Sequence, residues 1–218
     1  MIDKVFTLTS LEPMTPYAPN YKYFITRAIW NETKKIDKIK KYLLSKEKHI
    51  LQNINFNNDG GTGLSTKDLT SRHSNYNVFD FSEELPELND LHNFLKKTYL
   101  EYIKISNTQE YKLKINCWFN VLRKGQRMKM HTHGGHSWSY LSGNIHLDNY
   151  HTQTSYQFID KFVTLDNVKG GLAIFPNVIS HETNEYKDDE PRVSIAFDLH
   201  IETAQNLTED VQYKDFNE

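Results

Sequence analysis

The feature that most constrains this chain is a succession of short alternating segments that begins after Tyr111. Turn-forming pairs such as Lys124-Gly125 and Gly170-Gly171 separate these segments, which is the pattern of short β-strands. Many short strands at this spacing are typical of a β-sandwich or barrel. The expected strands are Lys112–Arg123, Arg127–His131, Ser137–Asp148, Phe162–Leu165, Gly171–Phe175 and Arg192–Ile201.

The part of the chain before Tyr111 has a different pattern. Val5–Leu11 and Tyr23–Ile29 predict two short strands. Apolar residues at helical spacing predict one helix that starts after residue 31 and a second over residues 86–103. We therefore predict an α+β fold.

The 218 residues fit a single domain. Within it we expect a helix-rich N-terminal support (1–110), a β core (111–202) and a C-terminal tail (203–218).

Charge and cysteine content limit the class of protein. The 26 basic and 28 acidic residues nearly cancel, and no basic arm or stripe is present, so binding of bulk nucleic acid is not expected. The single cysteine, Cys117, cannot form an internal disulfide, which suits a reducing cytoplasm. Residues 1–20 have no long apolar core, and about 18 consecutive apolar residues occur nowhere, so neither a signal peptide nor a membrane span is expected. The sequence does not fix the oligomeric state, and a homodimer is left open.

Two histidines stand close together in the segment His131-Thr132-His133. If a strand continues through them, both side chains lie on one face because side chains alternate with period two. Two imidazoles placed in this way can bind one metal ion. The alternative is a surface or hydrogen-bonded histidine cluster without metal.

His181 follows an apolar strand and a tight loop, and Arg192 and Ser194 come eleven and thirteen residues later. The same alternation places Arg192 and Ser194 on one strand face. An arginine fork and a hydroxyl inside a barrel can bind a ligand carboxylate. The alternative is a surface arginine paired with one of the acidic residues over positions 188–190.

Together these stretches resemble the iron(II)- and 2-oxoglutarate-dependent oxygenases, in particular the prolyl-hydroxylase-like proteins of the bacterial and phage type. The resemblance covers roughly residues 112–201. The matching stretches are Trp118–Gly125, His131–His133, Tyr140–Gly143, Gly171–Pro176, His181 and Arg192–Phe197. It implies a double-stranded β-helix, which is a jelly-roll, cupin-like core, with supporting N-terminal helices.

The resemblance also implies a site. His131 and His181 would be iron ligands, Arg192 and Ser194 would bind the far carboxylate of 2-oxoglutarate, and Asn120 could hydrogen-bond this co-substrate. The family has an acidic ligand where this chain has His133. Three readings follow: His133 ligates directly, which we favour; water or another acid such as Asp148 or Asp198 completes the site; or the protein is inactive.

The implied activity is a dioxygenase that hydroxylates a C–H bond while 2-oxoglutarate is decarboxylated to succinate. The substrate would be a small molecule or a peptidyl side chain. Two rivals remain: a three-histidine cupin-type dioxygenase that does not use 2-oxoglutarate, and a non-enzymatic jelly-roll binding protein. Arg192 and Ser194 distinguish the 2-oxoglutarate-dependent enzyme from the first rival, because a cupin-type dioxygenase does not need them. The metal content of the purified protein distinguishes it from the second rival.

Overall fold

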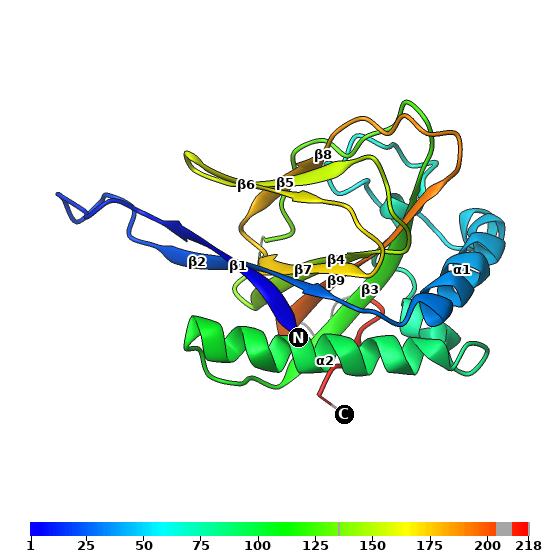
Figure 1. The fold of residues 1–218 in the computed structure, drawn as a ribbon, viewed down its shortest axis with the longest axis horizontal. Helices are drawn as coiled ribbons and strands as arrows, with labels where there is room; N and C mark the ends of the chain where they lie inside the picture. Colours follow the sequence, from blue (N-terminus) through cyan, green and yellow to red (C-terminus); the bar gives the residue numbers. More distant parts are fainter. Residues whose placement is uncertain (135, 204–210, 218) are drawn as a thin grey trace.

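The computed structural model describes residues 1–134, 136–203 and 211–217, and Figure 1 shows its two opposed β-sheets with two long helices. The helices are α1 (Thr33–Asn53) and α2 (Glu87–Ser106), and two short 3-10 helices, η1 (Leu69–Arg72) and η2 (Val78–Ser82), lie between them. The strands are β1 (Ile2–Thr9), β2 (Lys22–Ile29), β3 (Leu113–Leu122), β4 (Ser139–His146), β5 (Gln153–Phe158), β6 (Lys161–Asp166), β7 (Gly171–Pro176), β8 (Ser180–Thr183), β9 (Arg192–Ile201) and β10 (Lys214–Asp215).

All strand pairs among these elements are antiparallel. The large sheet has the order β1-β2-β7-β4-β9-β3-β10, and the small sheet has the order β6-β5-β8. In Figure 1 the small sheet lies above the middle of the large sheet, while the β1–β2 hairpin extends away from the body. The predicted α+β arrangement is therefore confirmed, and the two early strands join the β core.

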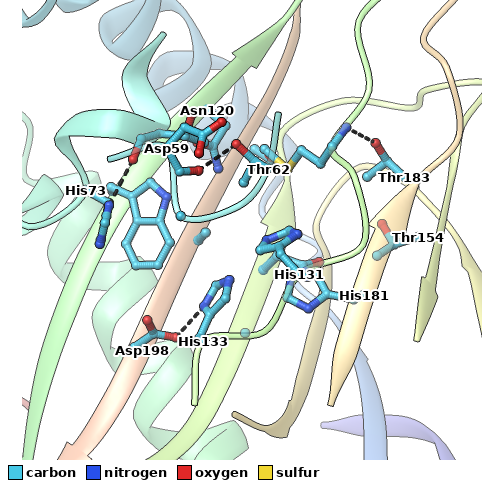
Figure 2. A pocket seen from close by; sticks show the side chains of 18 of the residues that line it. Asp59, Thr62, His73, Asn120, His131, His133, Thr154, His181, Thr183 and Asp198 are labelled. Carbon is cyan, nitrogen blue, oxygen red and sulfur yellow. Dashed lines mark hydrogen bonds and ion pairs between the residues drawn. The ribbon is translucent and has the colours of Figure 1, made fainter. Parts of the chain in front are cut away.

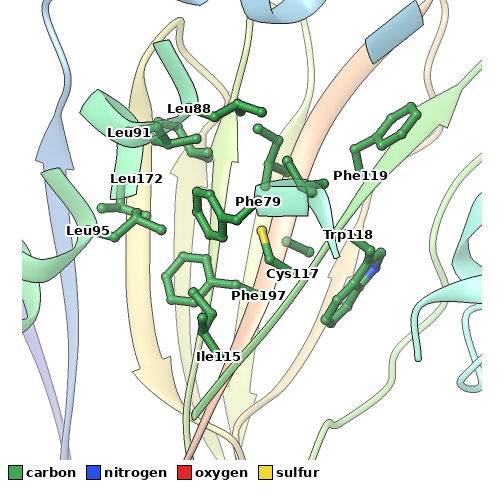
Figure 3. Close-up of a cluster of buried hydrophobic side chains, with 14 of the residues drawn as sticks. Phe79, Leu88, Leu91, Leu95, Ile115, Cys117, Trp118, Phe119, Leu172 and Phe197 are labelled. Atoms are coloured by element: carbon green, nitrogen blue, oxygen red, sulfur yellow. The ribbon is translucent and has the colours of Figure 1, made fainter. Parts of the chain in front are cut away.

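Helix α2 covers the face of the large sheet that is turned away from the small sheet (Figure 1). Its buried residues Leu88, Leu91 and Leu95 recur at helical spacing and point toward Cys117 and Phe197 in the sheet (Figure 3). Burial of each such leucine contributes about 1.5–3 kcal/mol of transfer free energy. Helix α2 packs against the apolar face of β3 and β9. The opposite face of these two strands is therefore available for a site.

Two parts of the chain differ from the strand pattern expected from the sequence. The predicted strand Arg127–His131 is not one, because only His131 forms a bridge, to His181, and Lys129 N–H donates to Thr62 in a loop. Strand β5 was missed because its sequence, Gln-Thr-Ser-Tyr-Gln-Phe, is mostly polar.

The predicted tail, residues 203–218, is outside the described residues over 204–210 and at 218. Its described part attaches to the core, because β10 pairs with β3 and Phe216 is 1% exposed. No helix in the described ranges is both long and apolar enough to cross a membrane.

Candidate metal and co-substrate site

A pocket of about 230 Å³ lies between the two sheets. The large sheet contributes β3, β4 and β9, the small sheet contributes β5 and β8, and the loop before η1 closes one side. Figure 2 shows Asp59 and Thr62 of this loop opposite His133 and Asp198. The chemically functional side chains that line it are Asp59, Thr62, His73, Asn120, His131, His133, Asn144, His146, His181, Arg192, Ser194 and Asp198.

Strand alternation builds the floor of the pocket. Arg192, Ser194, Ala196 and Asp198 all line it, as expected for every second residue of β9. At a rise of about 3.3 Å per residue, Arg192 and Asp198 are about 20 Å apart along the strand. The row therefore places a cation at one end of the pocket and an anion at the other.

Neighbouring strands extend this row sideways. Ser194 is opposite Asn120 on β3 and opposite His146 on β4, so three polar residues lie side by side in register. On β4, Asn144 and His146 line the pocket, and Ser142 is fully buried.

His131, His133 and His181 meet in this pocket (Figure 2), although fifty residues separate the first from the last. One ring nitrogen from each lies within 4.8 Å of the others. The backbone fixes the pair His131–His181, because N–H of each donates to C=O of the other at 3.1 and 2.9 Å. The predicted clustering is therefore present, formed by a loop segment and by β8 rather than by one strand.

Hydrogen bonds at Nδ1 orient all three rings. His131 Nδ1 donates to the Lys129 carbonyl at 2.7 Å, and His181 Nδ1 is 3.4 Å from the Ile179 carbonyl. His133 Nδ1 is 2.7 Å from Asp198 Oδ1. Because these partners are acceptors, each Nδ1 carries the proton and each Nε2 presents its lone pair. Metal-binding histidines are held in this way by their outer hydrogen bonds.

Burial keeps the imidazoles of His131 and His181 neutral. It lowers the pKa of His131 to about 4, and the neighbouring His133 adds to the effect. Burial likewise lowers the pKa of His181 well below its ordinary value, with further contributions from His131 and His133. A neutral imidazole is the form that binds a metal ion, so the set fits Fe(II), which accepts nitrogen ligands of this type.

Arg192 is buried inside the pocket, with 2% of its surface exposed, and does not pair with the acidic residues of the loop before it. Asp188 is instead paired with His151, and Asp189 with Lys124. The surface alternative for Arg192 is therefore wrong.

The guanidinium of Arg192 has few partners. Its Nη2 is 3.5 Å from His146 Nδ1, and its Nε and Nη1 have no hydrogen-bond partner among the residues that the structure describes. The Tyr150 ring lies 5.8 Å away, and burial lowers the pKa of Arg192 to about 10. A buried cation with two unpaired donors fits a ligand carboxylate.

The remaining predicted residues lie nearby. Ser194 and Asn120 are both 4% exposed and line the pocket, and Asn120 Oδ1 has no partner within the described ranges. Of the two acids considered as alternative ligands, Asp148 does not line the pocket and pairs with Lys40, whereas Asp198 lines it and contacts His133.

Sequence reasoning missed the loop before η1 as a pocket wall. Asp59 folds this loop, since its carboxylate accepts from the backbone N–H of Gly61 and Gly63 at 3.1 and 2.9 Å. Both glycines have positive φ, 80° and 74°. The three glycines at 60, 61 and 63 were the signal for a tight turn, but nothing in the sequence pointed to its place over His131.

Comparison with known proteins agrees with this geometry. Residues 144–198 match the model of a family described as "Putative 2OG-Fe(II) oxygenase". No curated protein matches the sequence significantly.

Solved structures share the fold. A Pseudomonas putida prolyl-4-hydroxylase is 10% identical with a TM-score of 0.55, over 82% of this chain and 93% of its own. The collagen prolyl hydroxylase of Paramecium Bursaria Chlorella virus-1, solved with 2OG, is 9% identical with a TM-score of 0.52, over 82% and 96%. The epimerase SnoN from nogalamycin biosynthesis, solved with Fe3+ and alpha ketoglutarate, is 12% identical with a TM-score of 0.52, over 81% and 78%.

At these identities the solved structures show the fold, and they confirm the predicted double-stranded β-helix. The matched segment runs from Asn144, near the end of β4, to Asp198 in β9 and includes His181, Arg192 and Ser194. The matched segment is about a quarter of the chain and is similar to the iron(II)- and 2-oxoglutarate-dependent oxygenases, while the solved structures show the shared fold.

Proposed function

We propose that this protein is an Fe(II)- and 2-oxoglutarate-dependent dioxygenase that hydroxylates a C–H bond of a small-molecule or peptidyl substrate. One observation carries the proposal: three imidazoles with their Nε2 atoms available share a pocket with a buried arginine that has unpaired donors. The three histidines would bind the metal ion, and the arginine would bind a carboxylate of the dicarboxylic co-substrate.

His131, His133 and His181 would hold the iron and leave its remaining positions open on the pocket side, as in facial three-ligand sites. Arg192 would bind the far carboxylate of 2-oxoglutarate by paired hydrogen bonds, with Ser194 and Asn120 beside it. With both groups bound, the site would supply decarboxylation of 2-oxoglutarate to succinate coupled to hydroxylation of the substrate.

The protein's own contribution is orientation and shielding. The Nδ1 hydrogen bonds prevent the three rings from turning, and the two sheets with the Asp59 loop exclude bulk water from the buried side. The substrate would enter past the loop that carries Asp59 and Thr62, beside His73 and Trp118, which also line the pocket.

The test is an anaerobic titration of the purified protein with Fe(II) and then 2-oxoglutarate, followed through the visible charge-transfer band of an iron-bound 2-oxo acid. We expect the band in the wild type, its loss in His181→Ala, and at least a tenfold weaker response to 2-oxoglutarate in Arg192→Met. His151→Ala is the matched control, because His151 is an exposed histidine outside the pocket.

Two outcomes would overturn the proposal. Iron binding without the band would favour a three-histidine dioxygenase that does not use 2-oxoglutarate. Absence of stoichiometric iron binding would favour a non-enzymatic binding protein.

A further inference from the structure

Asp198 lies beside His133 in the pocket and is joined to it by a hydrogen bond (Figure 2). Its Oδ1 accepts from His133 Nδ1 at 2.7 Å and from Ser142 Oγ at 2.6 Å. Asn177 Nδ2 donates to the same Ser142 hydroxyl at 3.0 Å. Asp198 is 7% exposed and Ser142 and Asn177 are at most 1% exposed, so this network is almost completely shielded from solvent.

The network orients the imidazole ring of His133, whereas separate hydrogen bonds hold its backbone. The backbone N–H of His133 and of Gly134 donate to the Asn177 carbonyl at 3.3 and 3.1 Å, so the main chain is anchored without Asp198. The imidazole has Asp198 as its hydrogen-bonding partner. The aspartate therefore decides which ring nitrogen faces the pocket.

The hydrogen bonds fit a carboxylate at Asp198, because its Oδ1 accepts from both His133 and Ser142. Among the described residues that line the pocket, Asp198 is the buried acidic side chain and Arg192 is the buried arginine.

With metal and co-substrate bound, the charges of the site would cancel. Iron(II) brings two positive charges and 2-oxoglutarate two negative ones, so with Arg192 and Asp198 the buried site has no net charge. Without Asp198 it would carry an uncompensated positive charge in surroundings of low dielectric constant, which is costly. Two histidines and one ligating carboxylate make the usual facial set for such iron sites. Here the negative charge is present one imidazole farther from the metal position.

We propose that Asp198 is a positioning residue that replaces the missing ligand carboxylate through His133: it directs His133 Nε2 toward the iron and supplies the negative charge of the site. The inference rests on the proposed function, because it concerns the same metal position. It assigns to His133 the role of a ligand that works only as a pair with Asp198.

The decisive variant is Asp198→Asn. Its side-chain oxygen can still accept from His133 and Ser142, so shape and hydrogen bonds are retained while the charge is lost. We expect Fe(II) to bind about 10–100-fold more weakly, the usual loss when the outer partner of a ligand histidine is changed. We also expect the charge-transfer band of the 2-oxoglutarate complex to move to shorter wavelength, because iron loses electron density when its anionic partner is removed.

The matched control is Asp148→Asn, the same substitution in a carboxylate that is paired with Lys40 outside the pocket. It should bind iron as the wild type does. Thermal melting of the metal-free variants verifies that both are folded.

A second variant tests the charge directly. The double variant His133→Asp with Asp198→Asn moves the carboxylate to the ligand position and keeps the total charge. We expect it to bind iron more tightly than His133→Asp alone, in which two carboxylates face each other.

The outcomes separate this inference from the proposed function. If the wild type binds iron and 2-oxoglutarate but Asp198→Asn matches it in affinity and band position, Asp198 is only structural and the inference is wrong. A double variant no better than His133→Asp would contradict it equally. If the wild type itself binds no iron, the proposed function fails before the variants are compared.

Discussion

Replacing Arg192 by methionine should make the metal-free protein more stable while it weakens the binding of 2-oxoglutarate. Burial lowers the pKa of Arg192 from 12.5 to about 10. Because the folded-state pKa is the lower one, the charged form is less favourable in the folded protein, and this penalty is present in full at neutral pH, below both values. At 1.36 kcal/mol per pKa unit the penalty is about 3 kcal/mol.

Two contacts offset part of this gain. The Tyr150 ring at 5.8 Å contributes roughly 1 kcal/mol as a cation–π partner, and the 3.5 Å contact with His146 contributes little at that length. A net stabilisation of about 2 kcal/mol remains, which corresponds to a melting temperature about 4–8 °C higher for a chain of this size. Loss of a pair of charge-assisted hydrogen bonds should also weaken the binding of 2-oxoglutarate by at least about tenfold.

The chain offers a matched control in Arg72, which is also buried, at 6% exposure. Arg72 donates to the backbone carbonyls of Leu51, Ile54, Thr66 and Asp68, so its charge is well solvated by the protein. Arg72→Met should therefore lower the melting temperature. Calorimetry in the presence of a chelator, with titration of 2-oxoglutarate alongside, measures both effects. If Arg192→Met melts below the wild type, Arg192 is a structural cation and the reasoning is refuted.

Two further predictions concern stability. Gly143→Ala should cost about 1–3 kcal/mol, seen as a lower melting temperature, because a Cβ there would collide with the Phe197 ring and lie 2.7 Å from the Ala173 carbonyl; an unchanged melting temperature would show that β4 and β9 can separate. Burial lowers the pKa of His92 to about 4, so between about pH 6.5 and 4 the unfolded chain binds a proton there that the folded protein does not, and stability falls as the pH falls. His92→Gln should remove up to about 2 kcal/mol of the loss between pH 7 and 5, measured by urea unfolding, and an equal loss in both proteins would contradict the assignment.

The sequence predicted the β core because strand alternation is a short-range pattern. Alternation placed Arg192 and Ser194 on one strand face, and the structure has them there. The strand predictions that were wrong concern segments where tertiary contacts override the alternation of apolar and polar residues. Lys129 N–H bonds to a loop residue, Thr62, which is about seventy residues earlier and invisible to local periodicity.

The contact between Asp198 and His133 is a part of the site that the sequence did not predict. Asp148 and Asp198 both appeared as acids that could complete the site. Alternation along β9 already favoured Asp198, because it is an even number of residues from Arg192 and Ser194 and so lies on their face. Asp148 follows the end of β4 at His146, where alternation no longer determines direction. The contact with His133 could not be predicted, since the loop that carries His133 has no regular structure.

Strand β9 connects the two ends of the site and fixes their separation. Arg192 and Asp198 belong to one continuous strand of ten residues that is paired on both sides, with β3 and with β4. A strand held by two neighbours cannot stretch or slip by one residue without turning every following side chain to the other face. Such a slip would move Asp198 from His133 into the apolar layer beneath α2. The separation between Arg192 and Asp198, and so between Arg192 and the histidine that Asp198 contacts, is therefore set by backbone geometry.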